Sequence, residues 1–224
     1  MKNRIIFCAY RKWAIDVYES IKVTYSNLDF YLAENQSQLV KLLSDSLKPN
    51  YIICVGWSWL VPDKIIDDYL VVGIHPSNLP DFAGGSPIQH QISEGITNTK
   101  NSLFRLTKNI DSGPVLAKVD LSLEGSLDNV FTNLTSSSIQ LISLLLDGNT
   151  KKADSKNEQK IKSRKRLTEQ DGNLSVEDFN QMSALELYNF MRCREDPYPN
   201  AYFEDNTGRL WFSGVKFQQK KDLK

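Results

Sequence analysis

The sequence contains little histidine or cysteine and has no surplus of either charge. Two histidines and three cysteines occur among 224 residues, and 27 Lys and Arg balance 27 Asp and Glu. The odd cysteine count, without CxxC spacing, argues against a disulfide framework or a structural zinc site. A net charge of zero gives no electrostatic reason to expect nucleic acid or an anionic membrane as a partner. We therefore expect a protein of the reducing cytoplasm that uses no metal and binds neither nucleic acid nor membrane.

Long hydrophobic runs are missing too. The N-terminal apolar segment is too short for a signal peptide, and no run approaches the length of a membrane span. Short apolar runs instead alternate with helix-like segments. Arg4–Ala9, Tyr51–Val55 and Tyr69–Ile74 predict buried strands, because such runs suit parallel strands that are covered on both faces. This alternation predicts an α/β fold with a doubly wound, mostly parallel sheet.

A polar segment, residues 151–166, divides the chain. It is poor in apolar residues, so we interpret it as a linker after a first domain over residues 1–150. Residues 167–224 contain a predicted helix that begins at Ser183 and a predicted hairpin around Asn206–Gly208. We therefore expect a small C-terminal α+β unit, whose aromatic content is compatible with a homodimer.

One histidine stands where a doubly wound sheet places its ligands. The stretch Val72–Ser86 reads VGIHPSNLPDFAGGS, and His75 follows the predicted strand Tyr69–Ile74. Ligands of such sheets bind beyond the carboxyl ends of the strands. Gly84 and Gly85 would allow the backbone to approach a ligand closely. His75 is thus a candidate proton donor or acceptor, and its alternative role is to cap the following turn.

A second predicted strand end carries Asp111, in the sequence KNIDSG. A carboxylate there could orient His75 and stabilise its protonated form. Asp before Ser-Gly is also a common turn sequence, so a purely structural role is the alternative. Spacing alone does not show that the two side chains meet. The other histidine, His90, has no second metal ligand at useful spacing.

Together these segments resemble the folate-dependent formyltransferases, which act on methionyl-tRNA, on glycinamide ribonucleotide or on amino sugars. The family pattern is a strand ending in Asn-x-His, then Ser-x-Leu-Pro, a Gly and a Pro, with an Asp-x-Gly turn further along. In this chain the pattern falls on His75, on Ser77–Pro80, on Gly84 or Gly85, and on Asp111–Gly113. The resemblance implies a Rossmann-like catalytic domain that transfers a formyl group from 10-formyltetrahydrofolate to an amine.

The resemblance also implies roles for the candidate residues. His75 would stabilise an oxyanion or take up the proton of the amine, and Asp111 would orient it. The family's asparagine falls on Gly73, which has no side chain. Asn78 or Ser77 could supply the missing donor, whose loss typically costs about 10²–10³ in rate. A slow enzyme or a catalytically silent folate-binding homologue is therefore an alternative.

The acceptor is the second open question. The sequence of Gly56–Ile92 is most similar to bacterial sugar N-formyltransferases of O-antigen and lipopolysaccharide biosynthesis. The expected acceptor is therefore a nucleotide-linked amino sugar. A tRNA formyltransferase would carry a separate C-terminal domain, for which the residues after the linker are too few. The glycinamide ribonucleotide and methionyl-tRNA types remain alternatives, as does a deformylase. The basic run Lys160–Arg166 is expected to be solvated, with contact to a diphosphate as the alternative.

Two sets of binding residues follow from the resemblance. The folate would lie between the segment after Tyr51–Val55 and the loop that contains Asp111. The expected folate-binding residues are Trp57, Ser58, Trp59, Leu60, Val61, Asn109, Ile110 and Gly113, and the expected acceptor-binding residues are Tyr10, Ser77, Gly84, Gly85, Arg194, Asp196 and Tyr198.

Overall fold

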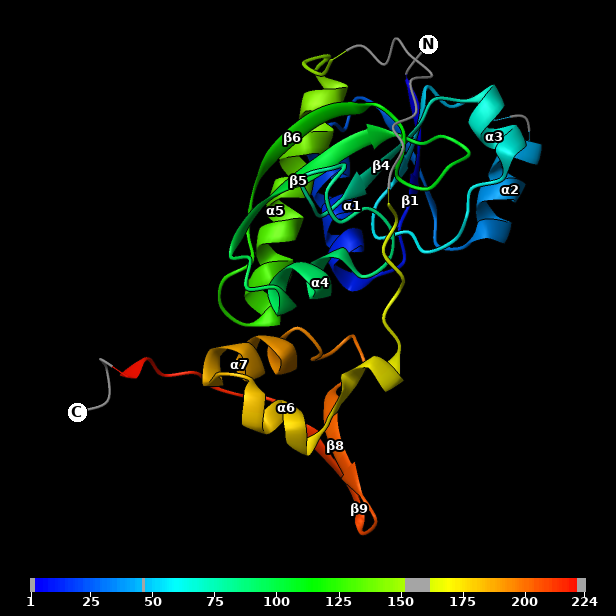
Figure 1. The fold of residues 1–224 in the computed structure, drawn as a ribbon. Helices are drawn as coiled ribbons and strands as arrows, with labels where there is room; N and C mark the ends of the chain where they lie inside the picture. Colours follow the sequence, from blue (N-terminus) through cyan, green and yellow to red (C-terminus); the bar gives the residue numbers. More distant parts are fainter. Residues whose placement is uncertain (1–2, 46, 152–161, 221–224) are drawn as a thin grey trace.

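A six-stranded sheet forms the larger part of the computed structural model, which describes residues 3–45, 47–151 and 162–220. The strand order is β2-β1-β3-β4-β5-β6 (Figure 1). The first four strands pair in parallel, whereas β5 and β6 are antiparallel additions, so the predicted fold class is confirmed. The bounds are β1 (Arg4–Cys8), β2 (Asp29–Ala33), β3 (Tyr51–Cys54), β4 (Val71–His75), β5 (Asn98–Arg105) and β6 (Val115–Ser122).

Helices cover both faces of this sheet (Figure 1). Ile5 and Phe7 of β1 pack with α1 and α5 on one face, and the alternating Ile6 and Cys8 pack with α2 and α3 on the other. The apolar runs are nearly continuous because both faces of each parallel strand are buried. The helices are α1 (Lys12–Thr24), α2 (Gln36–Ser44), α3 (Asp63–Asp68), α4 (Pro87–Ser93) and α5 (Leu127–Leu146). No helix in the described ranges is long and apolar enough to cross a bilayer.

The C-terminal residues form a second, three-stranded sheet with two short helices. The sheet has the order β7-β8-β9, and the predicted hairpin is β8 and β9. Helix α7 begins with a capping box, in which Ser183 and Glu186 bind each other's backbone N–H groups. The sequence analysis did not predict β7 or α6. The bounds are β7 (Asn173–Leu174), α6 (Val176–Gln181), α7 (Ala184–Arg192), β8 (Ala201–Asp205) and β9 (Gly208–Phe212).

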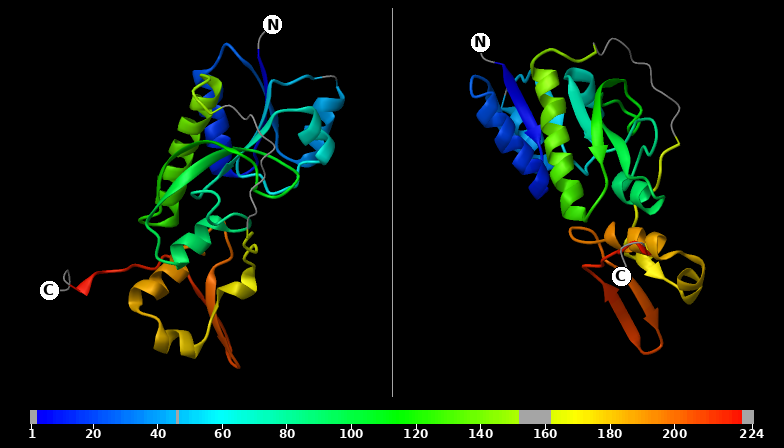
Figure 2. Two further views of the ribbon diagram at one scale, coloured as in Figure 1. Left: turned by 45° about the horizontal axis from the view of Figure 1, so that its top comes forward. Right: turned by 90° about the vertical axis from the view of Figure 1, so that its left-hand side faces the viewer.

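The C-terminal unit packs on the large sheet through α4 and α7 (Figure 2). Arg192 is buried, and its Nη1 donates to the carbonyl oxygens of Leu123 and Gly125, both at 2.9 Å. Cys193 is fully buried in the same apolar cluster as Ile88 of α4. The residues after α7 are therefore held against the large sheet by a shared core.

Residues 163–167, here called the strap, lie along the loop Ala83–Ser86. Arg164 N–H donates to the Ala83 carbonyl at 2.8 Å, and Gly85 N–H donates to the Arg164 carbonyl at 2.9 Å. Leu167 N–H donates to the Ser86 hydroxyl at 3.0 Å. Of the linker predicted over residues 151–166, residues 152–161 lie outside the described residues. Its described end is a docked segment rather than a free surface linker.

Candidate active site

A cavity of about 700 Å³ opens beyond the carboxyl ends of β1, β3 and β4. The strand order reverses between β1 and β3, and doubly wound sheets bind ligands at such a point. The remaining walls come from parts of the chain that are distant in sequence, namely residues 84–89, 104–111, 163–168 and 194–199. The C-terminal unit and the strap therefore complete a site that the large sheet begins.

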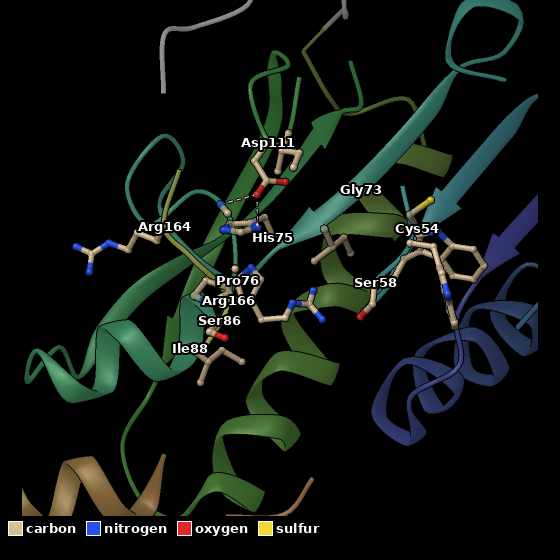
Figure 3. A pocket seen from close by; sticks show the side chains of 18 of the residues that line it. Cys54, Ser58, Gly73, His75, Pro76, Ser86, Ile88, Asp111, Arg164 and Arg166 are labelled. Atoms are coloured by element: carbon tan, nitrogen blue, oxygen red, sulfur yellow. Dashed lines mark hydrogen bonds and ion pairs between the residues drawn. The ribbon is translucent and has the colours of Figure 1, made fainter. Parts of the chain in front are cut away.

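His75 and Asp111 meet in this cavity (Figure 3). His75 is the last residue of β4 and is 6% exposed. Its Nδ1 lies 3.4 Å from Oδ2 of Asp111, and its Nε2 lies 2.8 Å from the carbonyl oxygen of Phe82. A carbonyl oxygen can only accept, so Nε2 carries a hydrogen and Nδ1 is the nitrogen that can take up a proton beside the carboxylate. This is the geometry of an imidazole oriented by an acid.

The carboxylate of Asp111 is held by a backbone N–H of the facing loop as well as by His75. Its Oδ2 also accepts the N–H of Gly84 at 2.7 Å. Asp111 has a φ of 51°, which is uncommon for a residue other than glycine. The turn is closed by the Ser112 hydroxyl, which donates to the Asn109 carbonyl at 3.0 Å. In this uncommon backbone conformation, Oδ2 of Asp111 points at both His75 and Gly84.

Aromatic side chains form another wall of the cavity. The rings of Trp57 and Trp59 lie 4.7 Å apart at a steep angle, and the Ser58 hydroxyl is 2.7 Å from the Tyr10 hydroxyl. Trp57 Nε1 is buried and has no hydrogen-bond partner among the described residues. A buried N–H without an acceptor is rare, so this wall suits a flat ligand that brings an acceptor of its own.

The space for the family's asparagine is filled by apolar side chains. A Cβ on Gly73 would lie 2.6 Å from Cδ1 of Leu106 and 3.1 Å from Cε1 of Phe104. The two side chains considered as substitutes do not line the cavity. Asn78 is exposed and binds Lys118 through Oδ1 at 2.7 Å, and the buried Ser77 hydroxyl donates to the Asp81 carbonyl at 2.6 Å. Neither is placed to donate a hydrogen bond to a ligand in the cavity.

The structure brings most of the other sequence-predicted residues to this cavity. Tyr10 does not line the cavity itself, but its hydroxyl is hydrogen-bonded to Ser58, which does. Gly113 lies against the Arg105 carbonyl, and Asp196 is exposed. The predicted residues that line the cavity are Trp57, Ser58, Trp59, Leu60, Val61, His75, Gly84, Gly85, Asn109, Ile110, Asp111, Arg194 and Tyr198; Tyr10, Ser77, Asn78, Gly113 and Asp196 are not among them.

Gly84 and Gly85 make room for the strap. A Cβ on Gly84 would overlap Ser163 Oγ and the backbone of Arg164, and one on Gly85 would overlap the backbone of Arg166. The close approach expected for a ligand is therefore made by the chain itself. The strap also brings Arg166 to the cavity wall, whereas the sequence analysis expected the basic run Lys160–Arg166 to be solvated and gave diphosphate contact only as the alternative.

We expect Gly85→Ala to detach the strap. The new methyl would meet backbone atoms, which cannot turn aside as a side-chain end can, so the free energy of unfolding should fall by about 1–3 kcal/mol. Trypsin should then cleave faster after Lys165 and Arg166, as peptide mapping would show. Gly95→Ala is the control, because its methyl would meet no atom within 4 Å and only its φ of 78° adds strain. An unchanged cleavage rate in Gly85→Ala would contradict the docking of the strap.

The model of the "Formyl transferase" family matches residues 18–132. Among curated relatives, methionyl-tRNA formyltransferase of Finegoldia magna is 28% identical over 174 residues, which are 76% of this chain and 55% of that protein. The chain thus spans about half the length of the curated relative.

Two solved structures share the fold over almost their whole length. One is a methionyl-tRNA formyltransferase from Clostridium thermocellum, with a TM-score of 0.84, 26% identity, and coverage of 96% of this chain and 94% of that one. The other is a 4-N formyltransferase from Francisella tularensis, with a TM-score of 0.73, 15% identity, and coverage of 97% and 98%.

The doubly wound sheet, with His75 at the end of β4 facing Asp111 of the loop after β5, defines an α/β fold with a ligand-binding cavity beyond its strand ends. Within that class the chain belongs to the folate-dependent formyltransferase family.

Proposed function

We propose that this chain transfers a formyl group from 10-formyltetrahydrofolate to the amine of a nucleotide-linked amino sugar. The observation that carries the proposal is the pairing of His75 with Asp111 inside a cavity that also holds an aromatic wall. Family membership supports the reaction class. The whole-length likeness to a 4-N formyltransferase supports a fold compatible with such an acceptor.

The aromatic wall fits the folate. The pterin ring is flat, so it can pack against the faces of Trp57 and Trp59 that line the cavity. Leu60 and Val61 extend the apolar side of the same wall. When bound, 10-formyltetrahydrofolate supplies an activated formyl group, and these side chains serve to hold it and to exclude water.

In the proposed reaction His75 acts at both ring nitrogens. The Nε2–H, which donates to the Phe82 carbonyl in this structure, can instead donate to the formyl oxygen as negative charge develops there. Nδ1 faces Asp111 and can take up a proton there, and a ring protonated in this way would carry a positive charge that opposes the oxyanion. The acceptor nitrogen forms a bond to the formyl carbon, the bond to the folate nitrogen breaks, and the proton lost by the amine ends on the folate nitrogen. No covalent bond to the protein is needed.

Methionyl-tRNA is the second candidate acceptor, because the curated relatives carry that name. The zero net charge of the chain favours the small acceptor, since tRNA binding draws on many phosphate contacts. The two candidates differ in size and in the salt dependence of binding, so one assay can separate them.

The test is the release of tetrahydrofolate from 10-formyltetrahydrofolate. We expect release when a pool of nucleotide-linked amino sugars is added, and none with the same pool after N-acetylation. Charged initiator tRNA is the parallel acceptor, and buffer without an acceptor is the blank.

Each outcome assigns the activity. Release that needs the amino sugar supports the proposal and allows the pool to be divided until the substrate is found. Release only with charged tRNA would replace the acceptor, and release in the blank would indicate a deformylase. Tetrahydrofolate binding without release in any arm would mark a catalytically silent homologue.

A further inference from the structure

Four arginines line the cavity, and one of them, Arg164, pairs with Glu94. The other three come from distant parts of the sequence: Arg11 follows β1, Arg166 lies on the strap and Arg194 follows α7; we call these three the arginine cluster. Tyr198 lies among them. Burial raises the pKa of Tyr198 to about 12, and the positive charges of Arg11 and Arg166 act against that rise. Tyr198 and both arginines line the same cavity.

The Asp171 charge acts on Arg194, but among the described residues no carboxylate lies within ion-pair distance of the arginine cluster. Within the described residues none of the three arginines forms an ion pair. Arg194 is only 7% exposed, and its Nη1 donates to the neutral Phe190 carbonyl at 2.8 Å. Cations that line a cavity are normally paired, and three that share one wall repel each other. The site therefore favours an anionic ligand.

The strap directs Arg166 into the cavity. Figure 3 shows the Arg166 side chain reaching towards Ser58, whereas Arg164 turns away from the cavity. Arg164 instead pairs with Glu94, and its guanidinium lies 4.2 Å from the centre of the Phe82 ring. The strap's backbone bonds to Ala83 and Gly85 hold this arrangement. An arginine fixed in this way presents a rigid fork of N–H donors, which matches the oxygens of a phosphate.

We propose that the arginine cluster is the subsite for the phosphate groups of the amine acceptor, with Arg166 as its principal ligand. This inference rests on the proposed function, and it favours the alternative role of the basic run Lys160–Arg166, contact with a diphosphate, at one residue of that run. The cluster and His75 line one cavity whose volume suits a small ligand. An acceptor anchored by its phosphates can therefore place its amine near the formyl group.

Binding without turnover tests the subsite. Inorganic pyrophosphate, UDP and dTDP are titrated calorimetrically into the full chain and into Arg166→Gln. We expect the affinity of the probes to fall about 10- to 100-fold, the loss typical of a hydrogen-bonded charge pair, and tetrahydrofolate affinity to stay within about twofold. Arg166→Lys should lose less, because it keeps the charge but not the fork. Arg11→Gln should weaken the same probes.

Lys165→Gln is the matched control, because it removes the same charge from the next residue. Lys165 does not line the cavity, and its Nζ binds Asp171 at 2.6 Å. We expect its probe affinities to equal those of the unaltered chain.

Three results would overturn the subsite. Equal probe affinities in Arg166→Gln and Lys165→Gln would remove its basis. Loss of tetrahydrofolate affinity in Arg166→Gln alone would show that the cluster holds the folate carboxylates. Loss of charged-tRNA affinity without loss of nucleotide affinity would assign it to tRNA phosphates. A fourth result would separate the two proposals. If the probes bind in an Arg166-dependent way but no acceptor is formylated, the phosphate subsite is supported and the proposed function is wrong.

Discussion

His75→Asn is expected to lower the rate of acceptor-dependent tetrahydrofolate release by about 10³-fold, because general acid–base action and oxyanion stabilisation would be lost together. Asparagine is polar and of similar reach, so the buried position between Phe82 and Asp111 stays filled. Its amide cannot hold a positive charge or move a proton. The effect should fall on kcat, while tetrahydrofolate affinity changes by less than about threefold. Stopped-time assays and a binding titration of the same sample measure both.

Asp111→Asn, measured alone and together with His75→Asn, tests whether the two residues act together. The amide can still accept the Gly84 N–H, but it places no negative charge beside Nδ1. If His75 and Asp111 act as one unit, the double variant should be about as slow as His75→Asn alone. If the rate loss of the double variant equals the product of the two single losses, Asp111 acts by holding the loop and not through the imidazole. A His75→Asn enzyme that keeps a tenth of its activity would remove His75 from the chemistry.

The large sheet was predictable from the sequence because burial on both faces leaves a simple pattern. The apolar runs that begin at Arg4 and Tyr51 became β1 and β3 with nearly the expected bounds. By contrast, β7 is two residues long and has no pattern of its own, since it exists only by pairing with β8. Helix α6 buries no residue fully, so its apolar spacing is weak. Such elements depend on tertiary contacts that local sequence does not record.

The site was predictable where it follows a strand end, and not where it depends on distant segments. His75 is the last residue of a buried strand and the stretch Trp57–Val61 follows another, and both line the cavity. The contact between His75 and Asp111 is set by the turn of the loop after β5, which sequence spacing does not define. The basic run Lys160–Arg166 was noted as a possible diphosphate contact, but the strap's polar composition is that of a linker and favoured a solvated role. A second, indirect signal was the pair of adjacent glycines, Gly84 and Gly85, which leave room for a close backbone neighbour.

The second large expected effect is a gain in kcat, and it concerns Gly73, where the family has an asparagine. The family carries at this position an amide expected to stabilise the oxyanion, and a well-placed donor of that kind is worth about 10²–10³ in rate. Gly73→Asn alone should gain little, because its Cβ would lie 2.6 Å from Cδ1 of Leu106. The crowded atom is the end of a flexible side chain, so the expected result is a lower melting temperature with the fold retained.

Combining Gly73→Asn with Leu106→Ala should remove the severe contact, leaving Cε1 of Phe104 at 3.1 Å from the new Cβ, and raise kcat by about 10²-fold. The shortened side chain leaves the space that the amide needs, so the two changes should be strongly coupled in both stability and rate. Leu106→Ala alone is the control, since it opens the same space without adding a donor. A double variant that is stable and no faster would show that the Nε2–H of His75 already meets the need for an oxyanion donor. In that case the imidazole of His75 would stabilise the oxyanion alone in this chain, whereas the imidazole and the asparagine amide do so together in the family pattern.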